Sequence, residues 1–140
     1  MQHTSTTSWL GDMKFDTEIS GHHLITDAPS SDGSSPAGPG PKRLLLSALA
    51  GCTGTDVISI LKKMRQEVEG FKIDIQAELT DEHPMYYNLI HIIYEFTAKN
   101  PDLDKYEKAI SLSQEKYCGV SFMFSHFAKI THEIKIIKSS

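Results

Sequence analysis

Residues 44–61 constrain the fold more than any other part of the chain, because they carry a single formal charge, at Asp56. Their length alone would be sufficient for a membrane span. Small and polar residues are nevertheless spread through the stretch: Ser47, Gly51, Thr53, Gly54, Thr55 and Ser59. A helix that faces lipid is more uniformly apolar than this. The pattern therefore favours a central helix buried inside a soluble domain.

This helix is expected to run from Lys42 to about Glu69. Pro41 suits its first turn, where a backbone N–H would have no partner, and Gly70 is a favoured residue just after a helix C-terminus. Its apolar side chains form one stripe that others widen: Leu45, Ala48, Leu49 and Cys52, then Leu46, Val57, Ile60, Leu61 and Met64. So wide an apolar surface is typical of a helix that is covered on several sides.

Alternating apolar and polar side chains predict strands before and after the helix. Before it, residues 13–19 and 22–27 are expected to pair as a hairpin around Ser20-Gly21. The proline-rich segment 29–41 is expected to be a loop. After the helix, three further strands are expected, at 71–79, 90–96 and 130–136.

A second helix is expected between the last two strands. Asp104 and Glu107 resemble a capping box at its start, and helical spacing continues to about Tyr117. Gly119 is expected to kink or end it before a short further turn that reaches Phe127. Strands interrupted by two helices indicate the α+β class, and the length indicates a single domain, residues 1–140.

Charge and the N-terminal sequence exclude several classes of protein. The net charge is −4 and the pI is about 5.9, whereas a general nucleic-acid binder needs a basic face to displace counterions. The first residues are polar and have no apolar core of signal-peptide length. We expect no nucleic-acid partner, no membrane association and a cytoplasmic location.

The two cysteines, Cys52 and Cys118, are 66 positions apart. Their spacing fits neither a CxxC redox motif nor a zinc ribbon, and cytosolic thiols are kept reduced, so a structural disulfide is not expected. Two interpretations remain. Either both are packed core residues, as buried cysteines often are, or the fold brings them together.

Two segments of the chain resemble a known family. Residues 40–52 read GPKRLLLSALAGC and residues 113–120 read SQEKYCGV. They are similar to the two cysteine segments of the osmotically inducible protein C and organic hydroperoxide resistance (OsmC/Ohr) family, and the hairpin at Ser20-Gly21-His22 with Asp27 also fits. Within that family, the chain looks most like an uncharacterised OsmC-like subgroup.

The resemblance implies an OsmC-like α+β fold in which antiparallel sheets surround a long central helix. It also implies an intertwined homodimer with active sites near the subunit interface. Family peroxidases use the first cysteine, here Cys52, as the attacking thiolate and the second, here Cys118, as the resolving thiol. A dithiol reductant regenerates them, and this chemistry requires no metal and no organic cofactor.

One departure from the family pattern concerns how the thiol is ionised. Family peroxidases carry an acid ten residues before the reactive cysteine, and it orients an arginine from the N-terminal region. Here that position is Lys42, and no arginine precedes Arg43. Since a free thiol is mostly protonated at neutral pH, we expect Lys42 or Lys14 to supply the positive charge.

Other interpretations follow from the same residues. Asp56 lies one helical turn after Cys52, on the same face, where a bare carboxylate would oppose thiol ionisation. The seven histidines fit no zinc motif, so no metal is expected. His126 could pair with Cys118 as in a cysteine hydrolase, but no orienting acid is evident. The main alternative is a non-catalytic scaffold that binds a small apolar ligand at the dimer interface.

Overall fold

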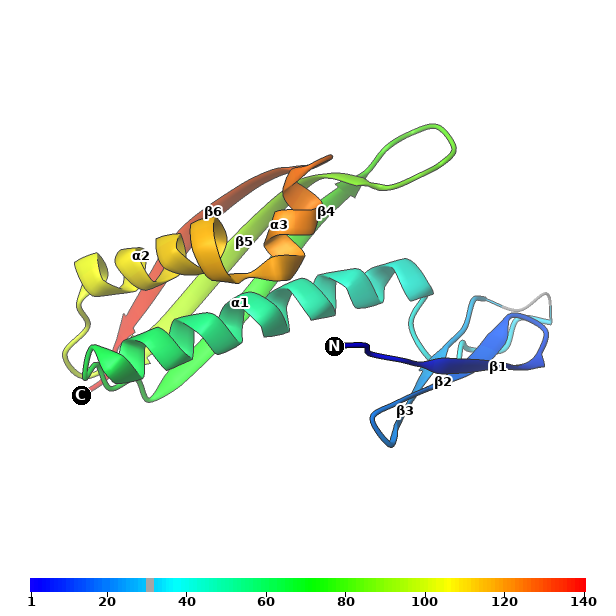
Figure 1. Cartoon of the computed structure of the whole chain (residues 1–140), viewed down its shortest axis with the longest axis horizontal. Helices are drawn as coiled ribbons and strands as arrows, with labels where there is room; N and C mark the ends of the chain where they lie inside the picture. The colour runs from blue at the N-terminus through cyan, green and yellow to red at the C-terminus, as the bar shows by residue number, and fades with distance from the viewer. Residues whose placement is uncertain (30–31) are drawn as a thin grey trace. The chain divides into compact units, whose positions relative to one another are not determined.

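The computed structural model describes residues 1–29 and 32–140 (Figure 1), which form two compact units, residues 1–47 and 48–140. Each unit is described by itself. A single domain that spans the whole chain stays a prediction. The loop expected at 29–41 includes residues 30 and 31, which lie outside the described residues. Its other residues contain no helix or strand before Pro41.

The first unit is a three-stranded antiparallel sheet in the order β1 (Thr6–Gly11), β2 (Lys14–Ile19) and β3 (His22–Thr26). The predicted hairpin is confirmed. Ser20 and Gly21 both have positive φ, 49° and 79°, as the central residues of a tight type I′ turn require. Strand β1 was not expected, because its side chains are polar or exposed and show no alternation of burial.

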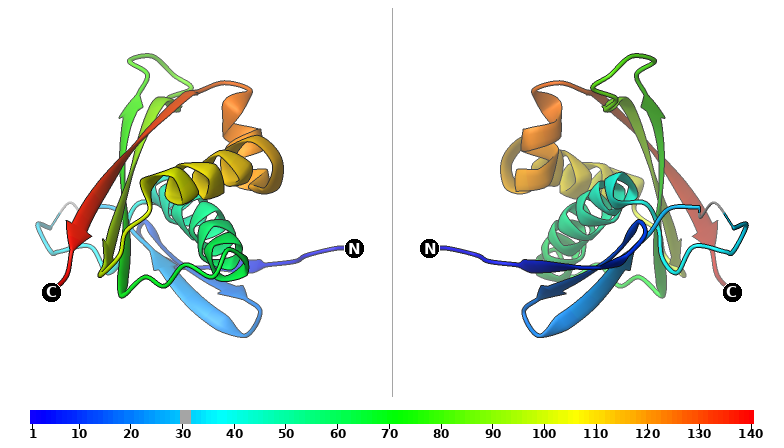
Figure 2. Two further views of the ribbon diagram at one scale, coloured as in Figure 1. Left: turned by 90° about the vertical axis from the view of Figure 1, so that its left-hand side faces the viewer. Right: turned by 90° about the vertical axis from the view of Figure 1, so that its right-hand side faces the viewer.

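The second unit contains a sheet in the order β4–β5–β6. Its strands are β4 (Gly70–Leu79), β5 (Tyr87–Ala98) and β6 (Lys129–Lys138). Antiparallel sheets were expected, and β4 and β5 do pair that way, but β5 and β6 are parallel. The reason is the connection between β5 and β6, which contains three helical segments. Parallel neighbouring strands require a long crossover connection of this kind. The helices of this unit lie on one face of the sheet (Figure 2).

The long helix α1 (Leu44–Lys63) follows a single 3₁₀ turn, η1 (Pro41–Arg43). It ends six residues earlier than predicted. Arg65 adopts a positive φ of 57°, and the backbone N–H of Gln66 donates to the carbonyl of Leu61 at 2.9 Å. This is a Schellman ending, formed here by arginine, whereas Gly70 begins β4 instead.

Within the described chain, one stripe of α1 is buried: Leu49, Thr53, Val57 and Leu61. Gly54 lets the helix approach β4 closely, because a Cβ atom at Gly54 would lie 3.0 Å from Cδ1 of Ile73. The prediction that α1 is covered on several sides is therefore not met within one chain, where Leu45 is 47% exposed.

The crossover contains α2 (Leu103–Leu112), a π-helical turn η2 (Ser113–Tyr117) and α3 (Gly119–Ser125). Helix α2 is capped by Asp102, whose carboxylate accepts from the backbone N–H of Lys105. The predicted capping box at Asp104 is wrong by two residues, since the N-cap is Asp102 and Asp104 lies inside the first turn. Aromatic rings of β5 and α2 form the core, where Phe96 and Tyr106 stack at 4.1 Å.

Candidate thiol site

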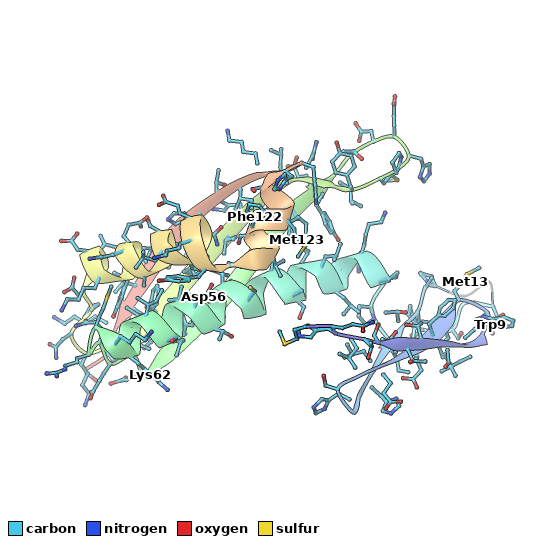
Figure 3. The ribbon with its side chains drawn as sticks, in the orientation of Figure 1. Trp9, Met13, Asp56, Lys62, Phe122 and Met123 are labelled. Atoms are coloured by element: carbon cyan, nitrogen blue, oxygen red, sulfur yellow. The ribbon has the colours of Figure 1, made fainter. Side chains whose placement is uncertain are left out.

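Cys52 and Cys118 lie together although the sequence separates them by 66 positions. Their sulfur atoms and a carboxylate oxygen of Asp56 all lie within 4.8 Å of one another. Cys52 and Asp56 come from successive turns of α1, the helix on which Figure 3 labels Asp56. Cys118 comes from the start of α3. Both cysteines are free thiols, with Cys52 half-buried and Cys118 buried.

The π-helical turn η2 determines where Cys118 points. The backbone N–H of Cys118 donates to the carbonyl of Ser113 at 2.7 Å, a bond that spans five residues instead of four. The extra residue per turn moves the following positions around the helix axis. Tyr117, which regular helical spacing would place with Ser113 on the buried face, is 53% exposed, and Cys118 is 3% exposed instead.

Asp56 is held by a hydroxyl of the same chain. Ser113 Oγ donates to Asp56 Oδ2 at 2.9 Å, which leaves the other carboxylate oxygen without a hydrogen bond from a described residue. No described lysine or arginine forms an ion pair with Asp56. The one charge in the apolar stretch thus faces the two thiols and is oriented by Ser113.

The chain is similar to known proteins over most of its length. A family model described as OsmC-like protein matches residues 31–133. Protein YhfA of Escherichia coli (strain K12) is 32% identical over 130 residues, which cover 92% of this chain and 94% of that protein. The chain belongs to the OsmC-like family.

Solved structures show the same fold. A crystal structure of a hypothetical protein from Aquifex aeolicus VF5 is 27% identical, with a TM-score of 0.88 over 100% of this chain and 99% of that one. The organic hydroperoxide resistance protein OhrB of Bacillus subtilis shares the fold at 15% identity, with a TM-score of 0.65 and 98% of each chain covered.

The fold also decides the role of the apolar helix. Residues Pro41–Lys63 are long and apolar enough to cross a membrane, with a mean hydropathy of 1.7. In the OsmC-like fold this segment is the long core helix of a soluble protein and not a signal sequence. The predicted α+β class, with two small sheets and one long helix, is confirmed.

The second thiol of this OsmC-like chain is biased toward its protonated form. Burial raises the pKa of Cys118 above the ordinary value of 9.0, and the hydrogen bond to Cys52 adds to this. The backbone N–H of Ser121, which lies 3.3 Å from the Cys118 sulfur, acts in the opposite direction. Burial dominates, so Cys118 is suited to remain a thiol at neutral pH.

Other predicted site residues are not brought to the thiols by any described contact. Lys14 lies in β2 and Lys42 in η1, both in the unit of residues 1–47. A stabilising positive charge from either lysine therefore stays a prediction. His126 Nδ1 lies 2.9 Å from the carbonyl of Phe122, and no histidine joins the cluster of Cys52 and Cys118 among the described residues.

A buried set of polar side chains lies beside the thiols, and the sequence interpretation missed it. Thr53 Oγ1 is 2.7 Å from Tyr94 Oη and 2.8 Å from Ser113 Oγ. The Gln114 amide donates to both Tyr94 Oη, at 2.9 Å, and Thr53 Oγ1, at 3.2 Å. Through Ser113 this polar network continues to Asp56, so it links α1, β5 and η2 around the site.

We expect Thr53→Val to reduce the free energy of unfolding by about 1–3 kcal/mol. Valine has nearly the same shape, but it leaves buried hydroxyls of Tyr94 and Ser113 with fewer partners, which costs about this much. Urea unfolding would measure the change. Thr55→Val is the matched control, since Thr55 is exposed on the same helix, and its effect should stay below about 0.5 kcal/mol. Equal effects at the two positions would contradict the proposed importance of the network.

Alkaline pH is expected to destabilise the fold through Cys118 and Tyr94. Burial raises the pKa of both groups above their ordinary values of 9.0 and 10.0, so the folded state holds these protons more tightly than the unfolded state. This stability is fully present below about pH 9 and is lost as the pH rises through the raised values. Urea unfolding of the reduced protein between pH 8 and 11 should show the decline. The double variant Cys118→Ala/Tyr94→Phe lacks both groups. If its free energy of unfolding declined equally over the same pH range, this assignment would be contradicted.

Proposed function

We propose that this protein is a thiol-dependent redox protein that reduces organic hydroperoxides or hydrogen peroxide through Cys52 and Cys118. The observation that carries the proposal is the proximity of the two sulfur atoms, within 4.8 Å, although the residues come from different helices. The similarity to OhrB, whose name refers to organic hydroperoxide resistance, supports the choice of substrate class.

The proposed reaction has three balanced steps. The Cys52 thiolate attacks one peroxide oxygen, the O–O bond breaks, and the leaving oxygen takes a proton to give an alcohol or water. Cys52 is then a sulfenic acid. The Cys118 thiol condenses with it, which forms a disulfide and releases water. A dithiol reductant exchanges with this disulfide and restores both thiols while it becomes oxidised itself.

The different surroundings of the two cysteines support different roles. Cys52 is half-buried, so a peroxide can reach it, whereas Cys118 is 3% exposed. A thiol that stays protonated can donate its S–H to the neighbouring Cys52 thiolate and stabilise it. When Cys118 later condenses with the sulfenic acid, it loses this proton and attacks as a thiolate. Within this proposal, Lys42 or Lys14 supplies the cation that the first thiolate requires.

The proposed working form is a cytoplasmic homodimer. OsmC-like proteins are typically homodimers. The exposed apolar side chains of α1, including Leu45 at 47% exposure, would be covered if two such helices packed together. This arrangement would also explain why the helix is apolar over more of its surface than one chain buries.

The test is a thiol count on the fully reduced protein before and after one equivalent of peroxide, with the rate followed by quenched alkylation. We expect both thiols to disappear together, much faster than the thiol of free cysteine reacts, and to return when a dithiol is added. A parent protein that reacts no faster than free cysteine would exclude the peroxidase and favour the alternative, a scaffold that binds a small apolar ligand.

A further inference from the structure

A second chemical capacity of the thiol site follows from the carboxylate beside the two sulfurs. We infer that Cys52, Cys118 and Asp56 form a binding site for a thiophilic divalent cation, with zinc as the expected ion. The inference uses the same two cysteines as the proposed function but does not rest on it, because binding requires only the geometry and no reaction with peroxide.

The spacing of the three ligand atoms fits a tetrahedral ion. Zinc binds thiolate sulfur at about 2.3 Å and carboxylate oxygen at about 2.0–2.2 Å, so neighbouring ligand atoms in a tetrahedron lie roughly 3.5–3.8 Å apart. The sulfurs of Cys52 and Cys118 and an oxygen of Asp56 all lie within 4.8 Å of one another. Small side-chain rotations would therefore complete the coordination without moving a helix.

The types of ligand select the kind of cation. Two thiolates are soft ligands that favour zinc over calcium or magnesium, which prefer oxygen ligands alone. Two thiolates and one carboxylate carry three negative charges, which a dication largely neutralises. Each thiol gives up its proton to the solvent when the cation binds.

Surrounding groups orient two of the three ligands. Ser113 Oγ donates to Asp56 Oδ2 at 2.9 Å, so Oδ1 is the oxygen left for the ion. The backbone N–H of Ser121 lies 3.3 Å from the Cys118 sulfur and donates to it. Such outer contacts fix ligand geometry in metal sites. The Ser121 hydroxyl is buried and has no hydrogen-bond partner among residues 1–29 and 32–140, and it could donate to the bound thiolate.

Three protein ligands leave a fourth position open. Cys52 is half-buried, so the site has an exposed side from which an ion can enter. The fourth ligand would then be water or another small molecule, in contrast to a structural zinc site, whose four ligands all come from the protein. The sequence spacing did not predict this site, because its ligands lie on α1 and at the start of α3 and form no local motif.

Cobalt and zinc test the inference on the reduced, full-length protein without peroxide. We expect one Co²⁺ per chain, with the strong d–d absorption of a tetrahedral site and thiolate-to-cobalt charge-transfer absorption, both removed by added Zn²⁺. Cys52→Ser and Cys118→Ser should each lose at least half of the charge-transfer absorption. The inference would be overturned if the protein bound no more Co²⁺ than a variant without cysteines. It would also be overturned if two chains shared one ion.

The decisive variant is Asp56→Asn, because any close pair of thiols binds zinc weakly. We expect it to weaken Zn²⁺ binding, measured by competition with a chromophoric chelator, at least about tenfold. Asp81→Asn, in the exposed β4–β5 loop, is the matched control and should leave the affinity unchanged. If Asp56→Asn fails to fold, Ser113→Ala gives a second measurement and should weaken binding about tenfold. Unchanged affinity in either folded variant would overturn the three-ligand site, and the peroxide assay would still decide the proposed function separately.

Discussion

Replacing Cys52 by serine is expected to slow peroxide consumption by at least about 100-fold, the scale seen when an attacking nucleophile is removed. The serine hydroxyl keeps nearly the same shape but is not ionised near neutral pH, so it cannot replace the thiolate. The rate should be measured with a dithiol reductant present in excess, so that each turnover consumes one peroxide. Cys118→Ser controls for the loss of one thiol without loss of the proposed nucleophile.

The two variants should fail in different ways. Cys118→Ser should still react once with peroxide and then accumulate a sulfenic acid on Cys52, which a dimedone-type reagent traps and mass spectrometry locates. Cys52→Ser should accumulate no such species. A sulfenic acid that forms on Cys118 in the Cys52→Ser variant, at the rate of the parent, would reverse the assigned roles. Full turnover in Cys118→Ser would show that the second thiol is not needed.

Phe96→Ala is expected to lower the free energy of unfolding by about 3–5 kcal/mol, the usual cost of removing a large aromatic side chain from a packed core. Phe96 has no exposed surface and stacks between Phe71, at 4.7 Å, and Tyr106, at 4.1 Å. It therefore joins β4, β5 and α2 in one cluster. Since a domain of this size is stabilised by about 5–15 kcal/mol in total, the variant should be close to unfolding. Urea or thermal unfolding would measure the loss.

Phe96→Leu is the graded control for this variant. Leucine keeps most of the buried volume, so the cavity is smaller and the loss of stability should be clearly less than that of the alanine variant. The thiol site should report the same event, because α2 leads directly into η2 and Cys118. If Phe96→Ala unfolds at the urea concentration of the parent, the aromatic cluster does not hold the second unit together.

Much of the secondary structure could be predicted from side-chain periodicity. The alternation of apolar and polar residues is clear in the sequences of β2, β4, β5 and β6. In β4 and in the first part of β6, exposure alternates in the same way. Strand β1 lacks that signal, since its residues are mostly exposed and its pairing with β2 rests on the backbone. The end of α1 was misplaced because a non-glycine residue, Arg65, takes the left-handed conformation there, which is uncommon enough that sequence reasoning assigns it to glycine.

The parallel pairing of β6 was missed for a different reason. Hydrophobic alternation shows that a strand has a buried face but not the direction of its neighbour. A crossover that contains α2, η2 and α3 was visible as helical sequence, but its return to the other side of β5 depends on packing between distant parts of the chain.

The thiol site was partly predictable. The resemblance of the two cysteine segments to one family led to the expectation that Cys52 and Cys118 lie together, and the spacing of Asp56 from Cys52 placed both on one helix face. The buried polar network was missed, because Thr53, Tyr94 and Ser113 come from three elements and each looks ordinary in its own segment. The one available signal was Thr53, a polar residue on the stripe of α1 that otherwise carries Leu49, Val57 and Leu61.

The π-helical turn has a consequence for how this site could be gained or lost. The orientation of the second sulfur depends on one additional residue within the turn that ends at Tyr117. If the same residues formed regular α-helical hydrogen bonds, Cys118 would be rotated by roughly 100° about the helix axis, the angle between successive α-helical residues. Thiol pairing in this chain therefore depends on the hydrogen-bonding pattern of one helical turn as much as on the presence of the cysteine itself.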